Sequence, residues 1–433
     1  MNDEEDRSKL LALTASGLAV GAFAGLVGSA FNFALAAAER FRSSVLDWAH
    51  HYPGVGWLAP VLLAAAAAFI ARWLVRRYAP EASGSGVQRV EAIIRGEAGT
   101  LNPAVLPMKF VGGVLALGAG LALGREGPTV QMAAAIGEGW ARLFKLRPGD
   151  HRALLAAGAG AGLAAAFNAP LAGAIFVFEE LLRRFELRVA VATLAACSGG
   201  LVIMRMLLGD RPVFAVPPIV VDLFPGFLMF LAFGVIMGML GVLYSRMVVT
   251  GLDIAERMRR ISPEMKAAIV GAVVGLLAFV APDVIGGGES QVESMLVGGH
   301  PLATIATLFA VRLVLGPLCY APGLPGGLFA PLLVIGAAAG LLLGTGAESL
   351  VPALKTPLAA FAAVGMGALF VAVVGAPVTG IALVVEMTGA TTLFVPLLTA
   401  CASALAVPAL LGCRPIYDTL RDRDTAQRKR LLP

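Results

Sequence analysis

Charged residues are scarce in this 433-residue chain, since Asp, Glu, Lys and Arg together make up only 14% of it. Water-soluble domains carry about 25% charged residues, so the shortage argues against a soluble protein. A very apolar soluble α/β protein is the alternative, but the strand signals that it requires are missing. Apolar residues make up 58% of the chain, and 52 residues are glycine. Such small residues let helices pack closely inside a membrane.

Apolar runs of membrane-spanning length recur along the chain. A backbone that crosses a bilayer must satisfy its polar groups within each segment, which predicts helices. The sequence therefore predicts an all-α polytopic membrane protein. Two further segments, 87–97 and 101–123, are short or interrupted by Gly and Pro, as re-entrant helices beside an ion site are. The long runs lie at 10–38, 57–71, 226–250, 266–281, 330–346 and 357–385.

Cysteine and histidine are also scarce, with four residues of each. The cysteines lie in or beside apolar stretches without metal-ligand spacing, which argues against a disulfide framework or a metal site. The histidines lie at predicted segment ends, and none has the neighbourhood of an intramembrane enzyme. We therefore expect a protein that is no enzyme and holds neither a metal nor a cofactor. The residues are Cys197, Cys319, Cys401, Cys413, His50, His51, His151 and His300.

Arginine and lysine are distributed unevenly among the predicted connections, and basic connections face the cytoplasm in membrane proteins. The stretches near 47 and 286 contain neither residue type, so we expect them on the other side. Both termini are then cytoplasmic, and the net charge of +5 needs no nucleic-acid partner. The acidic start, "MNDEEDRSKL", is no signal-peptide n-region. The basic clusters are Arg72, Arg76 and Arg77; Arg183, Arg184 and Arg188; Arg257, Arg259 and Arg260; and Arg421, Arg423, Arg428, Lys429 and Arg430.

An internal sequence repeat divides the chain into two halves. Residues 169–179 read "APLAGAIFVFE" and residues 376–386 read "APVTGIALVVE", about 207 positions later. Glycine-rich breaks near 124 and 326 repeat at a similar offset. The first copy ends beside basic residues and the second does not, which predicts inverted topology with a site near the midplane. We expect one transmembrane domain over 1–433, with repeats at 10–208 and 222–412 and a short cytoplasmic helix or tail at 413–433.

Three glycine-rich breaks suit an anion site, because helix N-termini offer unpaired N–H groups and partial positive charge. They are "ASGSGVQ" (82–88), "GREGPT" (124–129) and "GLPGGLFAP" (323–331). Each break alone could be an ordinary glycine turn that caps a helix. All three together, in a chain with inverted repeats, favour an anion site.

The same stretches resemble the signature motifs of the CLC family of chloride channels and proton-coupled chloride transporters. The quoted motifs are "GSGVQ", "GREGP" and "GLFAP", and "KFVGG", "GAPVTGIALVVEMT" and "CRPIYDTL" follow the family in order and spacing. The resemblance covers roughly residues 15–420. It implies a homodimer whose subunits each have their own pore, built from tilted and re-entrant helices in two inverted halves.

The resemblance also implies roles for single residues. Ser85 and Tyr417 match the hydroxyl groups that contact the central chloride, and Leu328 and Phe329 match its backbone N–H donors. Neutral donors bind chloride without trapping it. Glu126 matches the gating glutamate, whose carboxylate can occupy a chloride position and leave it when protonated.

Several supporting residues accompany these. Arg125 and Gly127 flank the gating glutamate. Lys109 is a cation predicted to be buried, which either tunes the local potential in favour of anions or neutralises a neighbour. In the family stretch a proline commonly stands where this chain has Gln88, and the difference leaves selectivity and rate open.

Glu180 matches the glutamate that exchanges protons with the cytoplasm in the family's transporters. The alternative is an interfacial charge that pairs with Arg183 or Arg184 along a helix. A pure channel of the family usually lacks a carboxylate here, so Glu180 favours exchange. Glu179 and Glu386 occupy equivalent places in the repeat, and we expect them to be structural.

The sequence therefore predicts a proton-coupled chloride antiporter. The alternatives are a passive voltage- or pH-gated chloride channel of the same family, an exchanger with altered anion selectivity, or, from a different class, a scaffolding membrane protein. The chain ends soon after Tyr417 without room for the CBS modules of many eukaryotic members. This favours a prokaryotic protein in the plasma (inner) membrane.

Overall fold

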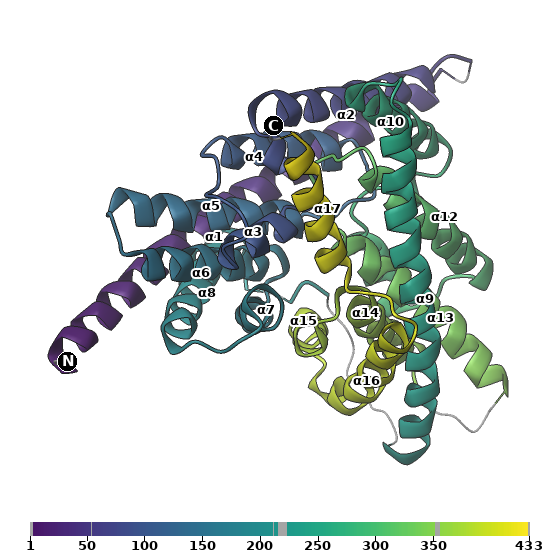
Figure 1. Cartoon of the computed structure of the whole chain (residues 1–433). Coiled ribbons are helices and arrows are strands. Elements are labelled where there is room, and N and C mark those ends of the chain that lie inside the picture. Colours follow the sequence, from purple (N-terminus) through teal and green to yellow (C-terminus); the bar gives the residue numbers. More distant parts are fainter. Residues whose placement is uncertain (1–2, 53, 211, 215–222, 351–355, 432–433) are drawn as a thin grey trace.

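The computed structural model describes residues 3–52, 54–210, 212–214, 223–350 and 356–431 (Figure 1). The described part is built from helices. The first half contains α1 (Asp3–His50), α2 (Leu58–Tyr78), α3 (Val87–Ile94), α4 (Val105–Gly118), α5 (Glu126–Leu143), α6 (Pro148–Phe167), α7 (Pro170–Phe176) and α8 (Leu187–Leu208). The second half contains α9 (Leu223–Arg257), α10 (Pro263–Val280), α11 (Glu289–Val297), α12 (Leu302–Tyr320), α13 (Phe329–Leu350), α14 (Leu358–Val374), α15 (Pro377–Thr388) and α16 (Phe394–Leu410), and α17 (Ile416–Leu431) follows it.

Some predicted features lie outside the described residues. Residue 222, the predicted start of the second repeat, is one of them. The side chains of residues 1–8 and 427–433 are others, and they include Arg428, Lys429 and Arg430 of the predicted basic tail.

Eight helices in the described part are long and apolar enough to cross a membrane. Five of the six predicted runs coincide with such helices. The prediction of one run over 357–385 was wrong, because Gly375 and Pro377 divide it into α14 and α15. A glycine with positive φ ends one helix there, and a proline at the first turn begins the next. The prediction also missed three spans: Leu187–Leu208, Leu302–Tyr320 and Thr391–Leu410.

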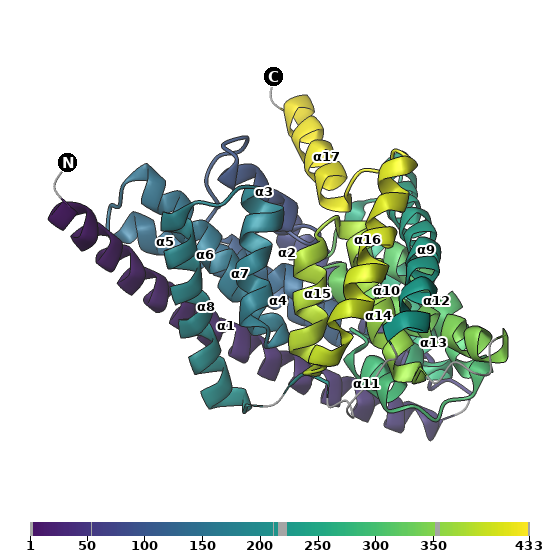
Figure 2. The same cartoon turned by 90° about the horizontal axis from the view of Figure 1, so that it is seen from below.

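The two halves repeat one order of elements and one pattern of packing. Helix α1 packs on α8 as α9 packs on α16, and α5 packs on α6 as α13 packs on α14. Figure 2 shows α7, α8, α15 and α16 along one flank of the molecule. The exact boundaries of the two repeats stay predictions.

Helices α7 and α15 carry the echoed motif and lie side by side (Figure 1). The Glu179 carboxylate accepts hydrogen bonds from the backbone N–H groups of Val378 (2.9 Å) and Thr379 (2.6 Å). The Glu386 carboxylate accepts from those of Leu171 (3.0 Å) and Ala172 (2.7 Å). Each glutamate lies at the C-terminal end of one helical segment, Glu179 in the turn after α7 and Glu386 in the last turn of α15, and caps the N-terminus of the other. The two helices therefore run antiparallel. This is the relation that inverted repeats require.

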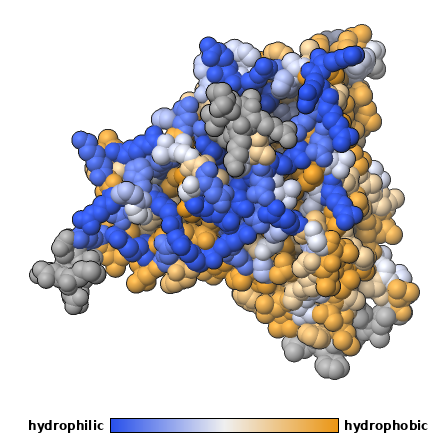
Figure 3. All heavy atoms as spheres, in the orientation of Figure 1, coloured by the Kyte–Doolittle hydropathy of each residue, from blue (hydrophilic) through white to orange (hydrophobic). Residues whose placement is uncertain are grey.

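Polar and apolar surfaces are separated. Polar residues gather over the face that carries α17, and apolar residues cover the flank formed by α9 and α16 (Figure 3). The start of α1 lies toward the same side as α17, whereas α11 lies at the opposite side (Figure 2). An apolar flank between two faces is what a bilayer-spanning protein requires.

Candidate ion-binding site

The three glycine-rich breaks meet inside the protein. The N–H of Gly124 donates to the carbonyl of Gly327 (2.9 Å), and the N–H of Gly327 donates back to the carbonyl of Gly124 (2.7 Å). The N–H of Gly326 donates to the carbonyl of Gly84 (3.1 Å). These bonds join the loops before α3, α5 and α13. The N-termini of three helices thus converge, as the sequence suggested, and converging N-termini favour negative charge.

Glu126 lies at this convergence and is fully buried. Its Oε1 accepts a hydrogen bond from the backbone N–H of Phe329 at 2.7 Å. Phe329 is the first residue of α13, so the carboxylate sits on that helix's N-terminus. The other oxygen, Oε2, has no hydrogen-bond partner among the described residues. The carboxylate therefore holds the place that a small anion could take.

Glycine is required around this carboxylate. A Cβ at Gly327 would lie 1.9 Å from Glu126 Oε1, and one at Gly124 would lie 1.9 Å from Oε2. A Cβ at Gly127 would lie 2.8 Å from both the carbonyl oxygen and the Oγ of Ser85. Any larger residue would displace the carboxylate or the serine, because real Cβ atoms do not approach heavy atoms so closely.

Ser85 and Tyr417 bring two hydroxyl groups to the same region. Both residues are fully buried, and their Oγ and Oη atoms lie 3.4 Å apart. Leu328 is also buried, and the Phe329 ring packs edge-on against Phe370 with centroids 4.6 Å apart. The Tyr417 ring lies 5.8 Å from that of Phe329. The site thus has neutral donors in an apolar wall, which suits an anion that must bind and leave.

Lys109 supports the loop that carries Ser85. Its buried ammonium group donates to the carbonyls of Ala82 (3.0 Å) and Gly84 (2.7 Å). In the other half, Arg312 donates to the carbonyls of Ile285 (2.8 Å) and Gly286 (2.6 Å). Both cations therefore fix a loop that precedes a short helix. The neutralising ion pair considered for Lys109 is not the arrangement in the described part of the chain.

Arg125 turns away from the carboxylate beside it. Its guanidinium group donates to the carbonyl of Ala166 (3.0 Å) and to Asn32 Oδ1 (2.7 Å), and it forms an ion pair with Glu289 (2.9 Å). This arginine therefore joins α1, α6 and α11 around the N-terminus of α5.

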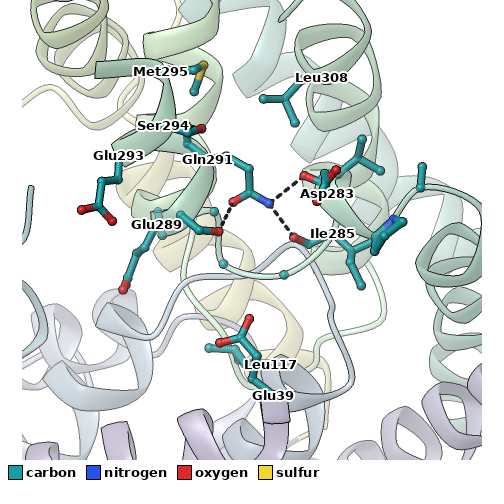
Figure 4. Close-up of a pocket in the computed structure, with 18 of the residues that line it drawn as sticks. Glu39, Leu117, Asp283, Ile285, Glu289, Gln291, Glu293, Ser294, Met295 and Leu308 are labelled. Carbon is teal, nitrogen blue, oxygen red and sulfur yellow. Dashed lines mark hydrogen bonds between the residues drawn. The ribbon is translucent and has the colours of Figure 1, made fainter. Parts of the chain in front are cut away.

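An open cavity of about 1250 Å³ lies next to Arg125 on the side away from α17. Glu39, Asp283, Glu289 and Glu293 contribute acidic groups to it (Figure 4). Gln291 closes one wall by donating to the carbonyls of Asp283 and Ile285. Arg125 lines this cavity, whereas the neighbouring Glu126 is buried and does not.

Glu180 lies in a different part of the protein, in the π-helical turn Val177–Leu182 that continues α7. Single π-turns in helices are frequent at functional sites. Its side chain is 2% exposed and its Oε1 has no hydrogen-bond partner among the described residues. The Arg183 guanidinium group comes no closer to Oε2 than 3.9 Å, which is long for an ion pair. Arg184 pairs with Glu186 instead. The ion pair that sequence reasoning considered is therefore long, and it leaves half of the carboxylate unsatisfied.

A buried ionic cluster beside Glu180 was missed by sequence reasoning. Glu91 Oε1 lies 2.6 Å from both Arg95 and Arg421. Asp418 lies 2.9 Å from Arg183 and 3.1 Å from Arg421. Because Asp418 follows Tyr417 directly, the cluster ties the start of α17 to the Glu180 region. The run of basic residues near the C-terminus indicated that charges gather here, but the sequence did not show which acidic residues they pair with.

A model of the family described as "Voltage gated chloride channel" matches residues 66–409. This chain belongs to the voltage gated chloride channel family. Its similarity to the H(+)/Cl(-) exchange transporter ClcA of Vibrio parahaemolyticus is 38% identity over 418 residues, covering 93% of this chain and 88% of that protein. ClcA of Citrobacter koseri is 35% identical over 430 residues, which cover 96% and 89% of the two chains.

Solved structures of voltage gated chloride channel relatives agree with the fold. The X-ray crystal structure of a slow cyanobacterial Cl-/H+ antiporter matches with a TM-score of 0.93 at 33% identity, covering 96% of this chain and 99% of that one. A eukaryotic CLC transporter matches with a TM-score of 0.80 at 23% identity, covering 95% and 74%, and shows a shared fold. The family and the all-α membrane fold predicted from the sequence are thus confirmed.

Proposed function

We propose that this chain exchanges chloride for protons across a membrane. The observation that carries the proposal is the Glu126 carboxylate on the N–H of Phe329, at the place where an anion would bind. A second buried carboxylate, Glu180, lies apart from it toward the side of α17. The names of the ClcA relatives and of the cyanobacterial antiporter support proton-coupled exchange.

Chloride, rather than a cofactor, is the proposed ligand. It would rest between the hydroxyls of Ser85 and Tyr417 and the backbone N–H groups of Leu328 and Phe329. These donors are neutral, and in a dry site they bind an anion without holding it permanently. Gly127 leaves room for the Ser85 loop, and Lys109 holds that loop in place.

Protons would use the two carboxylates. When Glu126 is ionised, it occupies the N–H of Phe329 and excludes chloride from it. When it is protonated, it loses the charge that binds it there and swings toward the cavity beside Arg125. Glu180 would pass protons to and from the cytoplasm. Exchange follows because the chloride and the ionised carboxylate compete for the same donors.

The test is reconstitution into liposomes with both ions recorded. An outward chloride gradient should drive protons uphill, and removing the gradient should stop them. Chloride flux without any proton movement would instead identify the passive channel. A lack of flux of either ion from well-folded protein would refute the proposal.

We further propose a homodimer in the plasma (inner) membrane, with both termini cytoplasmic. Apolar side chains remain exposed along α7, α8, α15 and α16, the flank at the front of Figure 2. A second copy could cover this flank, as the family resemblance implies. Crosslinking in lipid, at low protein-to-lipid ratio, should trap dimers through this flank. The exposed residues are Leu171, Leu194, Val202, Met206, Val378 and Leu398.

A further inference from the structure

Ser85 has two hydrogen-bond donors, and they have different partners. Its hydroxyl lies 3.4 Å from that of Tyr417. Its backbone N–H donates to the hydroxyl oxygen of Tyr320 at 3.3 Å. Tyr320 is the last residue of α12 and is 2% exposed. A second tyrosine thus reaches the residue that is proposed to bind chloride, and the mechanism above gives it no role.

The contact between Tyr320 and the Ser85 loop is tightly constrained. A Cβ at Gly84 would lie 3.0 Å from Tyr320 Oη and 3.7 Å from Gln88 Nε2, so the phenol and the amide flank this residue. The carbonyl of Gly84 is held by Lys109 at 2.7 Å and by the N–H of Gly326 at 3.1 Å. The loop therefore has little freedom to turn the Ser85 N–H away from the phenol.

The Ser85 N–H lies where it could otherwise donate to an anion. Ser85 directly precedes Gly86, the residue that caps the start of α3. The Ser85 N–H therefore lies just before the positive end of α3, a place that favours an anion. When the phenol oxygen of Tyr320 accepts this hydrogen bond, the Ser85 N–H is no longer available to a nearby anion. Ser85 then offers the anion its hydroxyl only.

We propose that Tyr320 sets the chloride affinity of the anion path, and that it weakens chloride binding by occupying the Ser85 N–H. The inference rests on the proposed function, because it assumes that chloride binds beside Ser85. Weak binding is useful here, since an ion that is held too firmly cannot leave. Tyr320 thereby acts opposite to Tyr417, whose hydroxyl binds the anion.

The experiment measures chloride binding by calorimetry and chloride turnover in liposomes for Tyr320→Phe. The change leaves the Ser85 N–H unpaired in a buried place, and a chloride ion is the group that can satisfy it. A hydrogen bond to a charged group is worth about 1.5 kcal/mol or more, so we expect roughly tenfold tighter binding. Turnover should fall, while the ratio of chloride to protons stays unchanged.

Tyr244→Phe is the matched control. Tyr244 is also a fully buried tyrosine, and its hydroxyl has no hydrogen-bond partner in the described part of the chain. Its replacement should leave chloride affinity unchanged. Tyr320→Leu removes the same oxygen and gives a second reading if the Phe variant does not fold.

The outcomes separate this inference from the proposed function. Unchanged or weaker binding in folded Tyr320 variants overturns the role of Tyr320, even if the wild-type protein exchanges both ions. A wild-type protein that binds no chloride refutes the proposed function itself.

Discussion

The carboxylate of Glu126 and the backbone N–H of Phe329 are joined by a 2.7 Å hydrogen bond across 203 residues of sequence. One group comes from the start of α5 and the other from the start of α13, so the bond connects the two halves of the chain. A negatively charged side chain on a helix N-terminus is stabilised by that helix. The same arrangement would stabilise chloride if the side chain left.

Replacing Glu126 by Gln should separate chloride movement from proton movement. The amide keeps the size of the carboxylate but carries neither the charge that competes with chloride nor the exchangeable proton. We expect proton uptake to fall to the background of empty liposomes while chloride flux continues. Chloride and pH electrodes in one liposome suspension measure both. Glu39→Gln, at an exposed position in the nearby cavity, is the control, and normal proton pumping by Glu126→Gln would contradict the gating role.

Glu180→Gln should also stop protons, but through a different step. Its carboxylate is buried and only loosely paired with Arg183, so it is available to accept a proton from the side of α17, which we propose to be cytoplasmic. We expect chloride flux to persist at a rate close to that of the wild type, with no uphill proton movement. Glu186→Gln is a suitable control, because Glu186 lies nearby and pairs with Arg152 at the surface. If Glu180→Gln still drove protons uphill, Glu180 would be only a structural charge.

Tyr417→Phe should weaken chloride binding. The variant removes one hydroxyl from the anion site and keeps the ring that packs against Phe329. A lost hydrogen bond to a charged ligand costs about 1.5 kcal/mol, which is roughly a tenfold rise in the chloride Kd. Calorimetric titration with chloride measures it, and a thermal unfolding curve shows whether the fold is intact. A Kd equal to that of the wild type would place the ion away from Tyr417.

The reciprocal caps of α7 and α15 predict a matched pair of stability effects. Glu179→Gln and Glu386→Gln each remove a charged acceptor from two backbone N–H groups at a helix start. Loss of such a cap costs about 1 kcal/mol, so both variants should unfold at lower temperature than the wild type. Glu179→Gln should lose somewhat more, because Glu179 also accepts from the Thr379 hydroxyl at 2.7 Å. The structural interpretation fails if either variant abolishes exchange while unfolding at the wild-type temperature.

The sequence was informative where a local pattern carries a physical requirement. Glycine clusters are needed where a Cβ would strike a carboxylate or a serine, and the breaks near 124 and 326 meet that need. The repeated A-P-x-x-G motif predicted two equivalent helices, and their reciprocal caps explain why a glutamate ends each copy. The predicted anion-binding residues Ser85, Phe329 and Tyr417 lie close together in the structure.

The sequence was less informative where contacts depend on packing between distant segments. Tyr320 meets Ser85 across 235 residues, and Arg421 meets Glu91 across 330 residues. Neither pair leaves a local pattern. The span Leu302–Tyr320 was missed because Arg312 interrupts its apolar run. The structure explains the interruption, since that guanidinium group is buried and bound to two carbonyls.

Native cysteines offer a test of the proposed orientation that needs no new residue. Cys197, Cys319 and Cys401 are buried, whereas Cys413 is half-buried in the turn between α16 and α17. A charged, membrane-impermeant maleimide should therefore label one thiol per folded chain. If α17 faces the cytoplasm, labelling should occur in inside-out vesicles and be absent from intact cells. Cys413→Ser should remove the signal from inside-out vesicles. Labelling of Cys413 on intact cells would reverse the proposed orientation, and with it the side from which Glu180 exchanges protons.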